Sequence, residues 1–273
     1  MGDMLYDMSL EALVEAIEGN LFALFKSFGA LPGAEVYDED DALRFLTEIG
    51  SPMFNGVARA HFSPSGDLIG KIEEQLAPFR ERNLPAFWWT GLTTQPGDLD
   101  ELLLEAGMEE NFVDAPGMAA DLSSLNEDAA TLPGLHIERV SDTQTLHEWA
   151  RAFNLSYGTP SFAGEAWVEA TSSLGFGESL PWSLYLGRVQ GEAVAVAILF
   201  LGAGVAGLYG IGTVPQARGQ GIGTAITVAP LLAARDLGYR VGILHASDMG
   251  VDMYRSLGFK QYCKINRYVL RPS

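Results

Sequence analysis

The stretch "QARGQGIGTA", residues 216 to 225, has glycine at alternate positions, Gly219, Gly221 and Gly223, just before a run of helix-forming residues. Glycine disfavours a helix start unless the backbone needs an unusual conformation or a close neighbour. The first amides of a helix lack partners within it and lie at the positive end of its dipole. The stretch therefore predicts a loop that binds an anion, and pyrophosphate is the expected ligand. A glycine-rich turn without a ligand is the structural alternative.

Two common phosphate-binding patterns do not fit this loop. Counted from Gly219, the dinucleotide fingerprint G-x-G-x-x-G puts Thr224 where its third glycine should stand. The pattern G-x-x-x-x-G-K-[ST] needs a lysine, and none follows these glycines. The loop also comes late in the chain, after several strand-like runs, whereas a dinucleotide site belongs to an opening βαβ unit.

The elements around the loop form a regular series in the second half of the chain. Their order is strand, helix, helix, three strands, helix, strand, helix, strand. This order predicts an α/β fold with a mixed, mostly antiparallel sheet flanked by helices. The expected ranges are 134–140, 142–158, 164–175, 182–190, 192–202, 205–214, 221–238, 240–247, 248–258 and 260–270.

The first half has a different charge from the second. Residues 1–130 contain 25 acidic and 6 basic residues, whereas residues 131–273 contain 10 and 11. With the turn-rich stretch "SSLNEDAATLPG" (123–134), this split predicts an acidic, smaller α/β domain over 1–125 and a second domain over 130–273. In the first domain we expect strands at 55–62, 86–91 and 117–122 and helices at 10–28, 65–83 and 95–107.

The bulk composition excludes several classes of partner. The net charge is −18 and no basic patch stands out, which argues against nucleic acid. The first helix is amphipathic with an acidic polar face, so neither a membrane span nor a membrane-surface role is expected. The only cysteine, Cys263, allows no intrachain disulfide and has the strand-like surroundings of a buried apolar residue. Without a visible targeting segment, these features predict a cytoplasmic protein.

The loop and the segment after it resemble a known family. Arg218, Gly221 and Gly223 fit R-x-x-G-x-G, and this strand, loop and helix resemble the coenzyme A motif of the GNAT N-acetyltransferase superfamily. "ASDMGVDMYRSLGF" (246–259) looks like the next motif of that superfamily, a short helix with a tyrosine that ends in Leu-Gly-Phe. The resemblance covers residues 134–273. The first half shares only the mixed pattern of strands and helices, so it is either a degenerate copy or an unrelated flanking domain.

The resemblance implies acetyl-CoA as the cofactor and a role for each matching position. The backbone near Gly212, Thr213 and Val214 would pair with the pantetheine arm, and Arg218 would support the phosphates or order the loop. The Thr224 hydroxyl would be an extra donor. The pyrophosphate would lie on the amides of Gly219, Gln220, Gly221, Ile222, Gly223 and Thr224.

Tyr254 is the candidate general acid that the resemblance implies. An ordinary phenol, with a pKa of about 10, is protonated at neutral pH and can donate to a leaving thiolate whose pKa is near 8.5. The structural alternative is a tyrosine that only packs beside Met253 and Leu257.

The general base is where the sequence departs from the family pattern. Many members have a carboxylate on the strand before the glycine loop, but that strand reads "VAGLYGIGTV", with Tyr209 near the expected place. A neutral phenol can orient a water molecule but is a poor base. His245, at the end of the next strand, is a titratable alternative. Four more candidates lie on helices that line the acceptor side in the superfamily, namely Glu165, Glu169, His147 and Tyr157.

The resemblance predicts an acetyl-CoA-dependent N-acetyltransferase that acts by direct attack of a primary amine on a small molecule or an exposed peptide. The partner would be that amine acceptor. A homodimer with a second copy of the chain is also compatible with the sequence. No metal site is expected. The missing carboxylate keeps a second interpretation open: a non-catalytic module that binds acyl-CoA and regulates a partner.

Overall fold

The computed structural model describes residues 4–177 and 180–272 and divides the chain into two compact units. The larger unit consists of Met1–Asn20 and Gly117–Tyr262, and the smaller unit of Leu21–Pro116 and Cys263–Ser273. Three elements have residues in both units: α1 (Leu10–Ser27), β5 (Glu109–Asp121) and β11 (Lys260–Leu270). The sequence boundary between residues 125 and 130 stays a prediction about domains.

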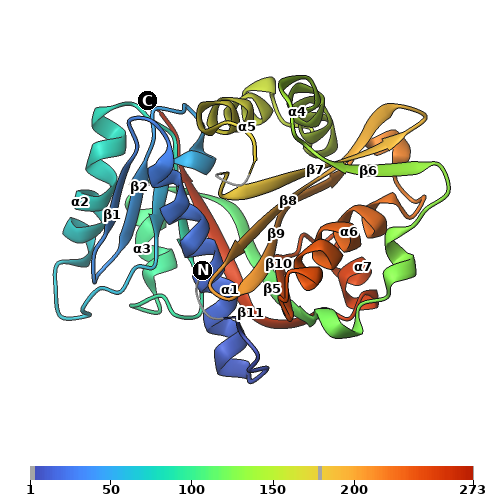
Figure 1. Cartoon of the computed structure of the whole chain (residues 1–273). Coiled ribbons are helices and arrows are strands. Elements are labelled where there is room, and N and C mark those ends of the chain that lie inside the picture. Colours follow the sequence, from blue (N-terminus) through green and yellow to red (C-terminus); the bar gives the residue numbers. More distant parts are fainter. Residues whose placement is uncertain (1–3, 178–179, 273) are drawn as a thin grey trace. The chain divides into compact units, whose positions relative to one another are not determined.

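The second half of the chain has the element order that its sequence predicts (Figure 1). The helix after the glycine loop continues through Pro230 as expected. Asp142 caps the helix that begins at Thr143, because its carboxylate accepts a hydrogen bond from the Thr145 amide. In chain order the elements are β6 (Leu135–Arg139), α4 (Thr143–Tyr157), α5 (Ser161–Leu174), β7 (Trp182–Val189), β8 (Glu192–Gly202), β9 (Val205–Thr213), α6 (Ile222–Asp236), β10 (Val241–His245), α7 (Val251–Ser256) and β11.

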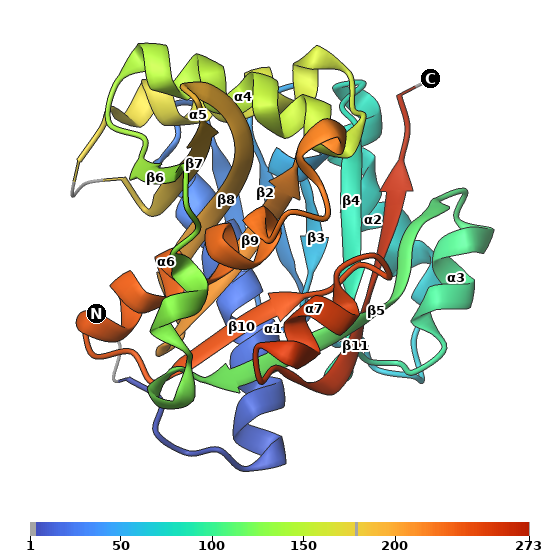
Figure 2. The same ribbon diagram turned by 90° about the vertical axis from the view of Figure 1, so that its right-hand side faces the viewer.

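Strands of the larger unit lie in the order β6-β7-β8-β9-β10-β5. β9 and β10 run parallel, and the other neighbouring pairs run antiparallel, so the predicted mixed and mostly antiparallel sheet is confirmed. α4 and α5 cover one face of β7, β8 and β9, and α6 and α7 lie on the other face (Figures 1 and 2).

Packing of α6 explains why the larger unit holds together around β9 and β10. The apolar stripe of α6 buries Val228, Leu231 and Ala234 completely. These side chains form one cluster with Leu208 of β9 and Leu244 of β10. Full burial of a valine or leucine side chain contributes about 1.5–3 kcal/mol, so the stripe holds the middle and last turns of α6 against both strands.

The smaller unit contains two strands that the sequence did not reveal, β1 (Glu35–Asp38) and β2 (Leu43–Leu46), because each is only four residues long. The strand expected at 55–62 is shorter, β3 (Gly56–Ala58). The remaining elements are α2 (Leu68–Glu81), β4 (Ala86–Thr90) and α3 (Leu99–Glu105).

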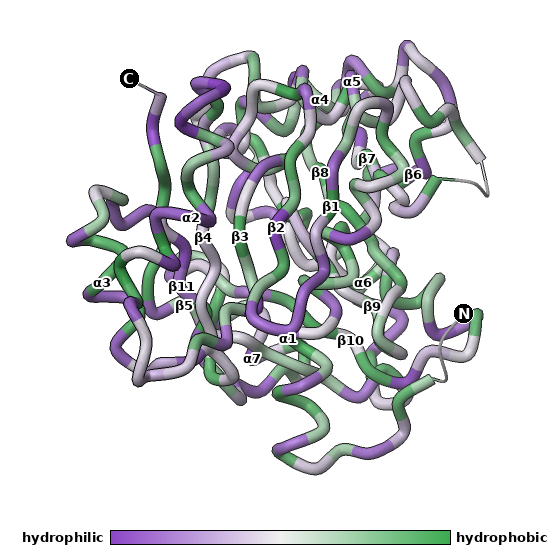
Figure 3. The backbone as a smooth tube through the Cα atoms, turned by 90° about the vertical axis from the view of Figure 1, so that its left-hand side faces the viewer, coloured by the Kyte–Doolittle hydropathy of each residue, from purple (hydrophilic) through white to green (hydrophobic). Residues whose placement is uncertain are grey.

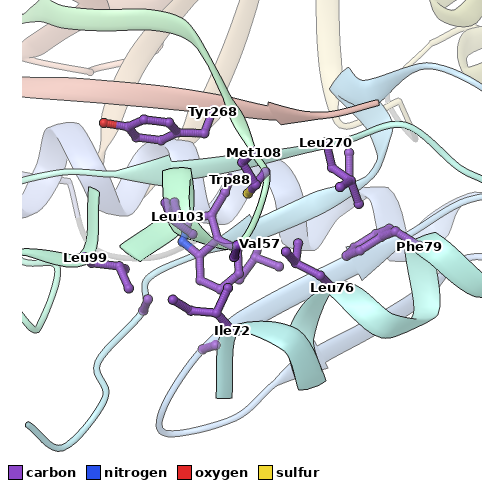
Figure 4. Close-up of a cluster of buried hydrophobic side chains, with 14 of the residues drawn as sticks. Val57, Ile72, Leu76, Phe79, Trp88, Leu99, Leu103, Met108, Tyr268 and Leu270 are labelled. Atoms are coloured by element: carbon purple, nitrogen blue, oxygen red, sulfur yellow. The ribbon is translucent and has the colours of Figure 1, made fainter. Parts of the chain in front are cut away.

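A hydrophobic core lies between the strands and helices of the smaller unit (Figure 4). Trp88 of β4 is fully buried there against side chains of α2 and α3 such as Ile72 and Leu103. Hydrophobic and hydrophilic residues are interspersed along α2, as an amphipathic helix requires (Figure 3). β11 closes this core with Tyr268 and Leu270.

The two units repeat one layout. β2, β3, α2, β4, α3 and β5 follow the same order as β8, β9, α6, β10, α7 and β11. β3 and β4 are parallel neighbours, as β9 and β10 are. Each unit takes its last strand from the other half of the sequence: β4 pairs with β11, and β10 pairs with β5. The repeat favours the degenerate-copy interpretation of the first half.

We expect neither half of the sequence to fold alone. A fragment of residues 130–273 lacks β5, which pairs with β10 along residues 117–121 and buries Met118 in the core around α6, and it also lacks Leu122, which follows β5 into the same core. The fragment should therefore expose a strand edge and aggregate or melt without a sharp transition. Circular dichroism melting curves would show this. Production of residues 1–125 and 130–273 together is the control, and a cooperative transition in the lone 130–273 fragment would contradict the prediction.

Candidate functional site

β9 separates from β10 in the middle of its length. The parallel pairing ends at Leu208, opposite Leu244, whereas β9 continues to Thr213 beside β8. One extra residue of β9 lies opposite β8 between Tyr209 and Gly212, which makes a β-bulge, and Gly210 has the positive φ of 54° that such a bulge accommodates. Beyond Leu208 this strand therefore has an open edge at the C-terminal end of a parallel pair, where α/β folds place their ligands.

The open edge of β9 offers amide donors to a ligand, because its carbonyl groups already accept hydrogen bonds from side chains. The Tyr157 hydroxyl donates to the Ile211 carbonyl at 2.8 Å, and Arg218 Nε donates to the Thr213 carbonyl at 3.1 Å. The amide and carbonyl of one strand residue point to the same side. The amides of Ile211 and Thr213 therefore face the open edge. The Val214 amide points the other way and donates to the Val194 carbonyl.

The glycine loop presents a row of free backbone amides. Gly219 and Gly221 have φ values of 73° and 81°, in the left-handed region that favours glycine, and Gly221 is the N-cap of α6 without a side-chain cap. The first hydrogen bond of the helix runs from the Ala225 amide to the Gly221 carbonyl. The amides of residues 219–224 donate to no acceptor in the described residues. Such a row at the positive end of a helix fits a pyrophosphate.

The corresponding helix of the smaller unit begins in a different way. Its N-cap is Asp67, whose carboxylate accepts a hydrogen bond from the Gly70 amide at 2.9 Å. A carboxylate at that place satisfies one first-turn donor and repels a second anion. α2 thus begins with a carboxylate where α6 begins with a glycine.

Arg218 orders the loop. It is exposed, and its guanidinium donates both to the Thr213 carbonyl at the end of β9 and to the Ser156 carbonyl at the end of α4, at 2.7 Å. Gly212 is needed at the same junction, because a Cβ there would lie 2.6 Å from the Ser156 Cβ. Of the two roles predicted for Arg218, the contacts support the second.

The end of β9, the start of α6 and α7 meet at Gly223. A Cβ built on Gly223 would lie 3.5 Å from Thr213 Oγ1 and 3.4 Å from Met253 Sδ. Both are ordinary contacts, so Gly223 is not required by packing within the chain. A glycine there leaves the space beside the loop open.

Tyr254 lies beside Met253 on α7 with 7% of its surface exposed. Its ring packs in the cluster that contains Leu208 and Val228, 6.1 Å from the ring of Phe259. Its hydroxyl has no hydrogen bond within the described residues. Burial raises the pKa of Tyr254 above its ordinary value, so this phenol keeps its proton at neutral pH.

Tyr209 lies on the opposite face of β9, because its neighbour Leu208 packs into the cluster of Tyr254. Its hydroxyl donates to Asn20 Oδ1 at 2.7 Å, and its ring meets the ring of His245 edge to face at 5.9 Å. Burial raises the pKa of Tyr209 too, so the residue is a neutral phenol whose proton is already held. Its catalytic role stays a prediction.

The other residues considered for the base differ in position. Glu165 and Glu169 on α5 and His147 on α4 are exposed, whereas Tyr157 lies over Gly212, with its ring 3.3 Å from a Cβ built there. Among residues 4–177 and 180–272, no group of His, Cys, Asp and Glu side chains could hold a metal ion. The same residues contain no helix that is long and apolar enough to cross a bilayer.

Comparison with known proteins gives similarity in structure only. No family model and no curated protein sequence matches the chain. A GCN5-related N-acetyltransferase from Kribbella flavida superposes with a TM-score of 0.69 at 17% identity, over 97% of this chain and 96% of that one. One from Sphaerobacter thermophilus gives 0.60 at 15% identity, over 96% and 93%. A tandem GNAT protein from the clavulanic acid biosynthesis pathway gives 0.56 at 11% identity, over 100% and 98%.

These similarities confirm the resemblance in fold. The chain has the GNAT fold over its whole length, and a tandem member is among the similar structures, in agreement with the repeated layout of the two units. Sequence reasoning missed the Ile211 amide, because a strand residue without a polar side chain carries no signal in the sequence. The bulge at Gly210, visible as closely spaced glycines in "GLYGIGT", was the one available hint.

Proposed function

We propose that the protein is an acetyl-CoA-dependent N-acetyltransferase whose active site lies in the larger unit. The observation that carries the proposal is the row of free amides from residue 219 to residue 224, directly beside an open strand edge. The row of amides would bind a phosphate group, and the strand edge would bind an amide-containing arm. The cytoplasm is the proposed compartment, and an amine the proposed acceptor.

The residues that would hold acetyl-CoA follow from the donors that they offer. The loop amides from Gly219 to Thr224 would bind the pyrophosphate, and Arg218 keeps that loop in place through its bonds to two carbonyls. The Ile211 and Thr213 amides would bind carbonyl oxygens of the pantetheine arm and the acetyl group. Gly212 serves this edge through its close contact with Ser156 rather than as a donor.

The chemistry divides between the two faces of β9. Acetyl-CoA would supply a thioester carbonyl whose carbon–sulfur bond breaks as a carbon–nitrogen bond to the amine forms. Tyr254, on the face of α6 and α7, would donate its proton or a hydrogen bond to the departing sulfur. The amine would arrive from the face that carries Tyr209, and it must arrive neutral, because β9 has no carboxylate to take its proton. The proton that the nitrogen loses as the amide forms would pass to solvent, from which Tyr254 would regain the proton given to the sulfur. Positioning and amide donors would contribute most of the rate enhancement.

Coenzyme A should stabilise the fold. At a concentration of one hundred times the dissociation constant, linkage gives about 2.7 kcal/mol, and the melting temperature should rise by about 5 °C or more. Differential scanning fluorimetry measures this rise. Dephosphorylated pantetheine without the nucleotide is the matched ligand control and should give a much smaller rise, because it lacks the pyrophosphate. Equal shifts with both ligands would contradict the assignment of the loop.

A sensor without catalysis is the second candidate, and the absence of a carboxylate from β9 favours it. Release of thiol from acetyl-CoA in the presence of a panel of primary amines separates the two. Binding without release would support the sensor.

A further inference from the structure

Tyr157 is a half-exposed aromatic residue with an unusual partner. It is the last residue of α4, and 48% of its surface is exposed, yet its hydroxyl donates to the carbonyl of Ile211 in the bulge of β9. Its ring lies 4.9 Å from that of Phe153, and Phe153 in turn lies 3.1 Å from a Cβ built on Gly210. Two side chains of α4 therefore contact the bulge at consecutive turns of the helix.

The bulge in β9 needs a contact from outside the sheet to fix its backbone. Gly210 has a positive φ, and the strand has one residue more than its neighbour β8 at this place, so the ladder with β8 does not fix the peptide groups of Gly210 and Ile211. On the opposite edge of β9, the pairing with β10 ends at Leu208, before the bulge. The Tyr157 hydroxyl and Arg218 are the side-chain donors that reach the open edge in the described residues.

The contact also changes what the edge can bind. A strand edge normally offers alternating donors and acceptors. Here the carbonyls of Ile211 and Thr213 are both engaged, so that their amides are the groups left for a ligand. An edge that offers donors attracts carbonyl oxygens and stabilises negative charge that develops on them.

We propose that Tyr157 is a positioning residue for the acyl group. By donating a hydrogen bond to the Ile211 carbonyl, it holds the bulge so that the Ile211 amide faces the thioester oxygen when an acyl-CoA binds. This inference rests on the proposed function. It assigns Tyr157 no proton transfer: the residue acts through the backbone of Ile211, and the pyrophosphate cradle at residues 219–224 works without it.

The test uses the full chain and two substitutions. Tyr157→Phe keeps the ring against Phe153 and Gly212 and removes only the hydroxyl, whereas Tyr157→Leu also removes the ring. Tyr6→Phe, which removes an exposed hydroxyl outside the helices and strands, is the control. Coenzyme A affinity is measured by calorimetry. Transfer is measured as thiol release from acetyl-CoA with hydroxylamine as the probe amine, after subtraction of the uncatalysed rate.

We expect Tyr157→Phe to keep coenzyme A affinity within about twofold and to lower kcat at least about tenfold, at an almost unchanged KM for acetyl-CoA, because a misplaced amide donor weakens rate more than binding. An unchanged kcat would overturn the inference. A loss of coenzyme A affinity as large as the loss in kcat would also overturn it. If the unmodified protein transfers to hydroxylamine and Tyr157→Phe does so equally well, only the inference fails. If the unmodified protein releases no thiol, the proposed catalysis fails and the inference with it.

Discussion

Gly219→Asp should weaken coenzyme A binding by between about fivefold and a thousandfold, while Gly219→Asn should leave it almost unchanged. Both side chains tolerate the positive φ at this position, and no heavy atom beyond the two neighbouring residues of the chain lies within 4 Å of a Cβ built there. The pair therefore differs in one charge. A unit charge about 4 Å from a phosphate costs about 1 kcal/mol in water and about 4 kcal/mol near a protein surface.

Calorimetry with coenzyme A gives the two affinities directly. The deficit of the aspartate variant should shrink as salt is added, because the loop is exposed and salt screens surface charges. Melting temperatures without ligand should agree between the two variants, which shows that folding is not the cause. Equal coenzyme A affinities of the Asp and Asn variants would mean that no phosphate lies near residue 219.

Local signals explain why the second half of the fold could be predicted. Periodicity, caps and glycine turns gave the order of its elements, including α6 through Pro230 and the strand with Cys263, which is buried as expected. β1 and β2 were missed because four residues are too few for a period to appear. The exchange of β5 and β11 between the units could not be predicted, since strand pairing over more than a hundred residues leaves no mark in a local pattern.

The same distinction applies to the candidate site. The loop glycines and Tyr254 stand in patterns that carry chemistry, so the sequence pointed to them. Tyr157 could only be named as one of several residues on the acceptor side, because its importance comes from the Ile211 carbonyl, 54 positions along the chain. Asn20, whose Oδ1 accepts a hydrogen bond from the Tyr209 hydroxyl, is 189 positions away and lies in a helix whose sequence pattern indicates only packing.

Tyr254→Phe should lower turnover by about 10²-fold, the lower end of the range for lost acid–base assistance, because a thiolate leaves more easily than an alkoxide does. Coenzyme A affinity should change little. The free energy of unfolding should also change little, since the hydroxyl has no hydrogen-bond partner within the described residues and the ring remains. The measurement is thiol release at saturating acetyl-CoA with a competent amine.

Tyr239→Phe is the matched control for this variant. Tyr239 belongs to the same hydrophobic cluster and is buried to the same degree, with 7% of its surface exposed, but it precedes β10 rather than lying on α7. Its loss of a hydroxyl should leave turnover at the wild-type level. If both variants lose turnover equally, the effect comes from packing in the cluster, and Tyr254 is not the acid.

The pH dependence tests the raised pKa of Tyr254 rather than its role as the acid. Burial raises its pKa, so the phenol stays protonated at pH values where an ordinary tyrosine, with a pKa of about 10, begins to ionise. An acid with a raised pKa loses activity only above that raised value. The wild-type rate should therefore show no decline up to about pH 10 that is absent from Tyr254→Phe. A decline in that range that vanishes in the Phe variant would mean that Tyr254 ionises near its ordinary pKa, and it would contradict the rise expected from burial in the cluster of Leu208 and Val228.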